Sequence, residues 1–231
     1  MKKKKIISLV TVLAFAAALG IGTKISAEGQ SEYMNGEYSE ILAESSPDDT
    51  GYEETYAADG NIEKVVADFN ADEISEIGKN IAITTEEIEK YKKYFALAGS
   101  DDPEKEAIDY AEERNALYVA AMENGYTVTD EEVWEYLEEL KSILKQEENA
   151  DMYEAAVSGF ESEEAYWDFE FEVYKVELPI QKYVASLESQ YQKETGIENQ
   201  EKFDAEWNEK FEEIKEEFVE EQNFTSINEK K

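Results

Sequence analysis

Residues 116–140 constrain the fold more than any other segment, because they encode one helix, a tight stop and a second helix. An apolar helical stretch ends at Gly125, a residue type that closes helices because it adopts the left-handed conformation without strain. Thr129 suits the N-cap of the next helix, and Glu132 stands three residues later to complete a capping box. Apolar residues then recur at helical spacing, at Val133, Leu137, Leu140 and Leu144. The segment therefore predicts two helices joined by a short turn.

The rest of residues 62–231 carries similar helix signals, and strand signals are nearly absent. Periodicity cannot decide whether residues 62–69 form a short strand or a helix, and residues 80–83 are typical of a brief extended segment. Helices are expected over about residues 84–99, 103–125, 129–148, 150–159, 162–196 and 200–222. The sequence therefore predicts an all-α fold of long helices, with at most one short strand.

The longest predicted helix, residues 162–196, carries two apolar rows. The first is heptad-like and consists of Tyr166, Phe169, Val173, Val176, Ile180, Tyr183 and Leu187. The second consists of Trp167, Phe171, Tyr174 and Leu178. Two apolar rows indicate either burial on both sides or one face left for a partner. We take the first row as core and the second row, together with Trp134, as candidate partner-contacting residues. Pro179 lies inside this segment and is expected to kink or break the helix.

The N-terminus has the pattern of a secretory signal. Residues 2–5 are lysines, residues 6–22 are apolar, and the small residue Ala27 closes an acceptable cleavage site. We expect cleavage after Ala27, so that 1–27 is a signal peptide; a retained segment would instead tether the protein to the membrane. The acidic, aperiodic residues 28–61 are typical of a disordered linker. The predicted location is extracytoplasmic: secreted, or at the outer face of the cytoplasmic membrane of a bacterium.

Charge and missing residue types exclude several functions. The chain has 22 basic and 57 acidic residues; residues 1–27 contain five lysines and no acid, so the mature chain has a net charge of −40. Such a charge opposes binding to nucleic acid or to an anionic membrane. The chain has no Cys and no His, which excludes disulfides, Cys-anchored lipids, Ser–His and Cys–His catalysis and His-ligated zinc. No phosphate-binding loop or dinucleotide fingerprint is present, and we predict no cofactor and no metal.

Four stretches, in order over residues 62–231, resemble the SurA/PrsA family of extracytoplasmic chaperones. Residues 80–88, Asn-Ile-Ala-Ile-Thr-Thr-Glu-Glu-Ile, are similar to the family's Asn-Gly-x-x-Ile-Thr-x-x-Glu-Ile opening, without its Gly. Residues 124–133, Asn-Gly-Tyr-Thr-Val-Thr-Asp-Glu-Glu-Val, resemble its Gly-x-x-Val-(Thr/Ser)-Asp-x-Glu-Val turn. Residues 159–166, Gly-Phe-Glu-Ser-Glu-Glu-Ala-Tyr, resemble the start of a later helix, and residues 203–218 its closing helix. The resemblance implies a SurA N-terminal-like domain over 62–231, with the closing helix packed on the N-terminal helices.

One departure from the family bears on function. Full-length members insert a parvulin-type prolyl isomerase domain before the closing helix, but only a dozen residues separate Tyr191 from Phe203 here. The resemblance therefore implies a holdase-type chaperone without enzymatic activity, which binds unfolded or partly folded secreted proteins. Client-contacting residues would be Trp134, Trp167, Phe171, Tyr174 and Leu178. Two alternatives stay open. One is a helical interaction module with one fixed envelope partner, which a homodimer through the heptad-like face would support. The other is a divergent prolyl isomerase-related protein.

Overall fold

The structure is a computed structural model that describes residues 41, 52–70, 72–146 and 150–227. The predicted signal peptide, 1–27, and the predicted linker up to residue 51, apart from residue 41, lie outside the described residues. The described chain forms two compact units. One comprises residues 131–146 and 150–171 and is called here the three-helix unit; the other comprises residues 52–70, 72–130 and 172–227 and is called the sheet unit.

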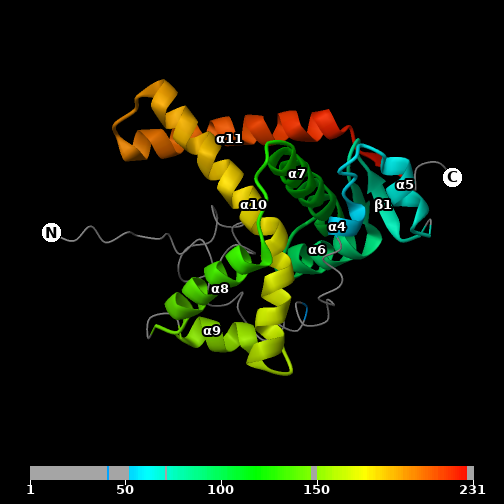
Figure 1. Ribbon diagram of the computed structural model, residues 1–231, viewed down its shortest axis with the longest axis horizontal. Helices are drawn as coiled ribbons and strands as arrows, with labels where there is room; N and C mark the ends of the chain where they lie inside the picture. Colours follow the sequence, from blue (N-terminus) through cyan, green and yellow to red (C-terminus); the bar gives the residue numbers. More distant parts are fainter. Residues whose placement is uncertain (1–40, 42–51, 71, 147–149, 228–231) are drawn as a thin grey trace. The chain divides into compact units, whose positions relative to one another are not determined.

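The sheet unit is mainly helical and contains one small sheet (Figure 1). Its helices are α4 (Tyr52–Thr55), α5 (Ile62–Ala67), α6 (Thr85–Leu97), α7 (Pro103–Glu123), the later part of α10 (Glu163–Thr195) and α11 (Gln200–Gln222). Its strands are β1 (Ile74–Ile77), β2 (Ala82–Thr84) and β3 (Thr225–Ser226). The prediction of a predominantly helical fold is confirmed, and residues 62–67, for which helix and strand were both open, are helical.

The sheet has the order β2-β1-β3, and both strand pairs are antiparallel. The extended segment predicted at residues 80–83 contributes β2, while β1 and β3 had no clear sequence signal. Gly78 lies in the turn between β1 and β2, where a Cβ atom would meet the Phe224 ring at 2.8 Å. Only glycine leaves room for that close approach. Phe224, which follows α11, can therefore pack against the hairpin that precedes α6.

The helix boundaries follow local signals. Thr84 is the N-cap of α6, and its hydroxyl accepts a hydrogen bond from the backbone N–H of Glu87 at 3.0 Å, as the capping pattern predicts. Asp102 caps α7, and Pro103 occupies its first turn. Gly125 ends that helical segment with φ +80°, in the left-handed region. The predicted stop after α7 is therefore confirmed.

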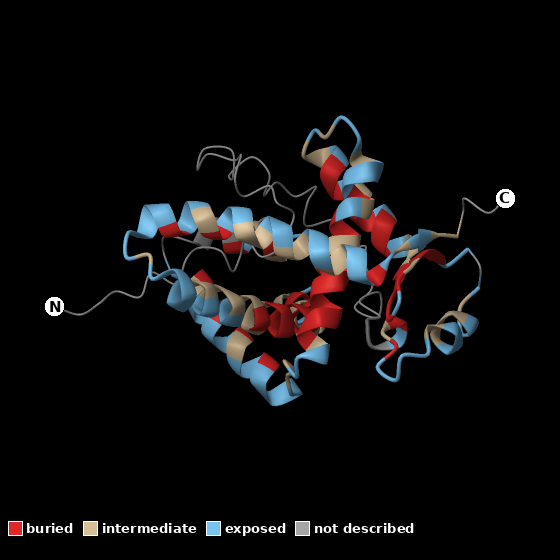
Figure 2. Cartoon of the chain, turned by 90° about the horizontal axis from the view of Figure 1, so that it is seen from above, coloured by how far each residue is buried: buried red, intermediate tan, exposed pale blue. Residues whose placement is uncertain are grey.

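One buried cluster of the sheet unit lies between α7, α10 and α11. Leu117 and Val119 of α7 belong to this cluster with Val176 and Ile180 of α10, and Phe211 of α11 packs against it. Lys215 of α11 also binds Glu113 of α7, with Nζ 2.7 Å from the carboxylate. The closing helix thus packs on α7, the arrangement that the family resemblance implies. Figure 2 shows buried residues along helices whose other faces are exposed.

The three-helix unit consists of α8 (Asp130–Leu144), α9 (Ala150–Val157) and the first turns of α10. The helical row predicted for α8, Val133, Leu137, Leu140 and Leu144, is buried throughout. Rings from α9 and α10 complete the core, with Tyr153 packing against both Tyr166 and Trp167. In the part of the chain that the structure describes, no helix is long and apolar enough to cross a bilayer.

Two expectations need comment. Of the kink or break expected at Pro179, the break does not occur, because α10 is helical from Glu163 to Thr195 with Pro179 inside it. A proline removes one helical hydrogen bond, and the neighbouring residues Val176, Leu178 and Ile180 are buried, which offsets that cost. Ordered structure also begins before the predicted linker boundary at residue 61: α4 covers Tyr52–Thr55, and Tyr56 forms an isolated bridge with Ile81.

Candidate functional site

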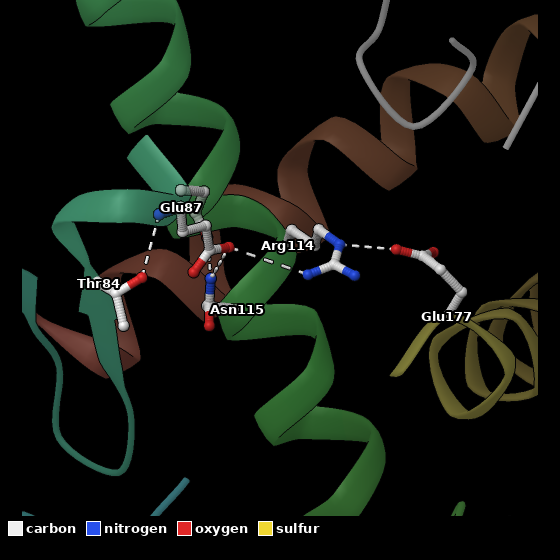
Figure 3. A network of polar contacts seen from close by, with 6 residues as sticks. Thr84, Glu87, Arg114, Asn115 and Glu177 are labelled. Carbon is white, nitrogen blue, oxygen red and sulfur yellow. Dashed lines mark hydrogen bonds and ion pairs between the residues drawn. The ribbon is translucent and has the colours of Figure 1, made fainter. Parts of the chain in front are cut away.

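A buried polar network in the sheet unit is the first arrangement to assess as a site (Figure 3). Glu87 of α6 accepts a hydrogen bond from the side-chain amide of Asn115 at 3.0 Å. Arg114 of α7 donates from Nε to Glu177 of α10 at 2.6 Å, and its Nη1 lies 3.9 Å from the Glu87 carboxylate. All four side chains are buried. The network therefore joins α6, α7 and α10 from inside the core.

This network has the features of a structural element. Each charged group in it faces a partner of opposite charge, which buried charges require. Burial raises the pKa of Glu87 to about 7, although Lys90 and the hydrogen bond from Asn115 favour the charged carboxylate. A raised pKa alone does not make a catalytic group, because structural networks perturb pKa values as well. We therefore assign the network to stability and look for function at the surface.

The three-helix unit has a surface cleft of about 530 Å³ between α8 and the start of α10. Residues at helical spacing from both helices line it, so that two stripes face each other. The α8 stripe consists of Trp134, Leu137, Glu138 and Lys141, and the α10 stripe consists of Glu163, Glu164, Trp167 and Asp168. The cleft therefore combines two indole rings with four carboxylates and one ammonium group.

Among the described residues, Trp134 is a large apolar side chain that is exposed to solvent, with 40 % of its surface accessible. Its ring stacks on Phe171 of α10, with 4.6 Å between ring centroids and 17° between the planes. This contact fixes the ring from one side and leaves part of it open to solvent. A rigid, partly exposed indole at the edge of a cleft is typical of binding surfaces, since such a ring buries much area at little entropic cost.

Trp167 forms the inner wall of the cleft. It is buried, and its indole Nε1–H donates a hydrogen bond to the Tyr153 hydroxyl at 3.1 Å. Lys141 crosses above it, with Nζ 5.3 Å from the ring centroid and 3.0 Å from the Glu163 carboxylate. Lys145 binds the same carboxylate at 2.7 Å. Hydrogen bonds from Lys145, Lys141 and Tyr153 lower the pKa of Glu163 to about 2.

The structure brings together only part of the predicted contact set. Trp134, Trp167 and Phe171 lie in the three-helix unit, and the first two line the cleft. Trp167, Tyr174 and Leu178 are 4 %, 1 % and 6 % exposed, so these three do not form the open row that the sequence suggested. The reason in the three-helix unit is that α10 is covered by two helices, since Trp134 of α8 stacks on Phe171 and Tyr153 of α9 holds Trp167.

The heptad-like row is buried as expected, apart from the half-buried Leu187. Tyr166, Val173 and Val176 are among its buried members. A homodimer through these buried side chains would require them to leave the core. The heptad-like row therefore does not support the alternative of a module that dimerises through it.

Sequence reasoning missed the charged half of the cleft. Glu138, Lys141, Glu163, Glu164 and Asp168 were not singled out, because 57 acidic residues make any single carboxylate uninformative. The spacing of two of these carboxylates relative to their neighbours could have identified them. Glu138 follows Trp134 by four residues, and Asp168 follows Glu164 by four, which places each pair on one helix face.

Compared with models of known protein families, with characterised proteins and with solved structures, the chain shows no significant match. Within the described residues, no group of three or more Asp and Glu side chains is arranged to hold a metal ion. The geometry of the cleft and the motif resemblance are therefore the grounds on which a function can be proposed.

Proposed function

We propose that this chain is a holdase-type chaperone, secreted or membrane-associated, that binds unfolded or partly folded exported proteins and has no isomerase activity. The observation that carries the proposal is the cleft between α8 and α10, with Trp134 partly exposed at its edge. The N-terminal signal pattern and the four ordered motifs of the SurA/PrsA family support it from the sequence.

The binding energy of such a site is modest, as a chaperone requires. A tryptophan side chain has up to about 250 Å² of surface, and Trp134 exposes 40 % of its own. Covering that remainder stabilises a complex by up to about 2.5 kcal/mol at about 25 cal/mol per Å². One indole thus gives weak, reversible contact with an apolar client side chain, and the high negative charge keeps the complex soluble.

Suppression of aggregation tests the proposal. The mature chain, residues 28–231, should slow the aggregation of several unrelated unfolded proteins, and Trp134→Ala should weaken this effect. Glu135→Ala is the matched control, because Glu135 is exposed on α8 and is not among the cleft-lining residues. Activity toward a single protein alone would favour a fixed-partner module instead. Equal suppression by both variants would refute the assignment of the cleft.

A further inference from the structure

The charge distribution of the cleft points to a particular class of client segment. Resting on the proposed function, we propose that the cleft selects segments in which a lysine or arginine lies beside an apolar or aromatic residue. The apolar side chain would lie on Trp134, and the cationic group would meet Glu138, Glu164 and Asp168.

The first argument is the charge of the lining. Four carboxylates and one ammonium group line the cleft, a net charge of −3. Glu163 is already engaged by Lys141 and Lys145. Among the described residues, no ion pair or hydrogen bond involves the side chains of Glu138, Glu164 or Asp168, and all three are exposed. Three carboxylates of the cleft are therefore available to an incoming cation.

The second argument is that the cleft already holds one cation in the proposed way. The ammonium group of Lys141 lies 5.3 Å from the centroid of the Trp167 ring and 3.0 Å from the carboxylate of Glu163. Cation–π and ion-pair contacts thus act on the same group. Trp134 together with Glu138 offers an incoming lysine the same two features, and Trp134 is partly open to solvent.

Structural roles account for only part of this charge. Glu164 lies in the first turn of α10, where a carboxylate is favourable to the helix dipole. Glu138 and Asp168 lie inside their helices and have no such role. Their placement beside two indole rings gives the cleft a polarity that a purely apolar client site does not need.

The experiment uses three labelled peptides that share the same Phe and Leu residues and differ only in carrying Lys, Gln or Glu between them. Fluorescence anisotropy with the mature chain should show the Lys peptide binding about tenfold more tightly than the Gln peptide, as expected for up to three exposed ion pairs. The Glu peptide should bind least. The advantage of Lys should shrink as salt is raised, because exposed charges are screened.

Two triple variants locate the effect. Glu138→Gln with Glu164→Gln and Asp168→Asn should remove most of the Lys advantage and leave Gln-peptide binding unchanged. The control removes three exposed carboxylates of α11 by Glu209→Gln, Glu216→Gln and Glu220→Gln, and it should keep the full advantage. Circular dichroism confirms that both variants fold.

The outcomes separate the two proposals. An equal Lys advantage in both triple variants would overturn this inference, because the preference would then come from the overall charge of −40; the cleft would still be the client site if Trp134→Ala weakened all three peptides. If Trp134→Ala bound all three peptides as tightly as the wild type, both the proposed function of the cleft and its charge preference would be overturned. Self-association that Trp134→Ala abolishes, without peptide binding, would also overturn both and identify a second copy of the chain as the occupant.

Discussion

Replacing Glu87 by Gln should stabilise the protein above neutral pH and change little in mild acid. Burial raises the pKa of Glu87 from 4.5 to about 7, so the folded state holds a proton that the unfolded state releases. Folding therefore takes up a proton between about pH 4.5 and pH 7, and stability falls as the pH rises through this range. Below it the carboxyl group is neutral in both states. Glutamine removes the charge and keeps an oxygen that accepts from Asn115.

The size of the effect follows from the same values. The difference between 4.5 and about 7 corresponds to about 3 kcal/mol at about 1.4 kcal/mol per pKa unit. Glu87→Gln should gain up to this amount above pH 7, since the folded pKa already includes the attraction to neighbouring cations such as Lys90. The pH dependence should be reduced but not abolished, because burial and the nearby Glu76 also raise the pKa of the half-buried Glu112 to about 7.

Urea unfolding followed by circular dichroism at about pH 5 and about pH 8 measures this difference in free energy. Glu209→Gln, an exposed carboxylate of α11, controls for the general relief of negative charge. Wild-type stability that stays level between the two pH values would refute the reasoning. So would a Glu87→Gln variant less stable than wild type at pH 8, since attraction to Arg114 and Lys90 would then outweigh the cost of burial.

Further predictions concern the turn, the cleft wall and the N-terminus. Gly125→Val should cost about 1–2 kcal/mol through backbone strain alone, since φ is +80° and a Cβ atom there would meet nothing within 4 Å; an unchanged thermal melt would contradict the left-handed geometry. Trp167→Ala should lower stability by about 3–5 kcal/mol, because the ring is buried and hydrogen-bonded to Tyr153, whereas Trp134→Ala should cost far less in the same melt. Intact-mass measurement of protein from the native host should show cleavage after Ala27, and a mass that retains residues 1–27 would instead indicate a membrane tether.

The helices could be predicted because their ends are specified locally. Thr84, Asp102 and Gly125 mark helix boundaries within a few residues of chain, and the structure has boundaries at each of these positions. The sheet could not be predicted in the same way. Strand β1 is four residues long and pairs with the two-residue β3. The paired residues Ile77 and Thr225 are far apart in the sequence. Such short, non-local strands have no period to detect.

The candidate site was predictable only in part for a related reason. Aromatic spacing identified Trp134, Trp167 and Phe171, which lie together in the three-helix unit. Aromatic spacing could not predict that α9 covers a second side of α10, because that contact depends on the tertiary packing of α9 and not on the sequence of α10. The carboxylates of the cleft gained meaning only when the fold placed them beside the indole rings.

Site-specific cross-linking tests the central claim most directly. A photoreactive phenylalanine analogue placed at Trp134 should cross-link to several unfolded exported proteins and not to their folded forms, and the same probe at the exposed Glu216 of α11 should give little product. Equal yields at the two positions, or no cross-links from position 134 to any unfolded client, would contradict the assignment of this cleft as a chaperone site.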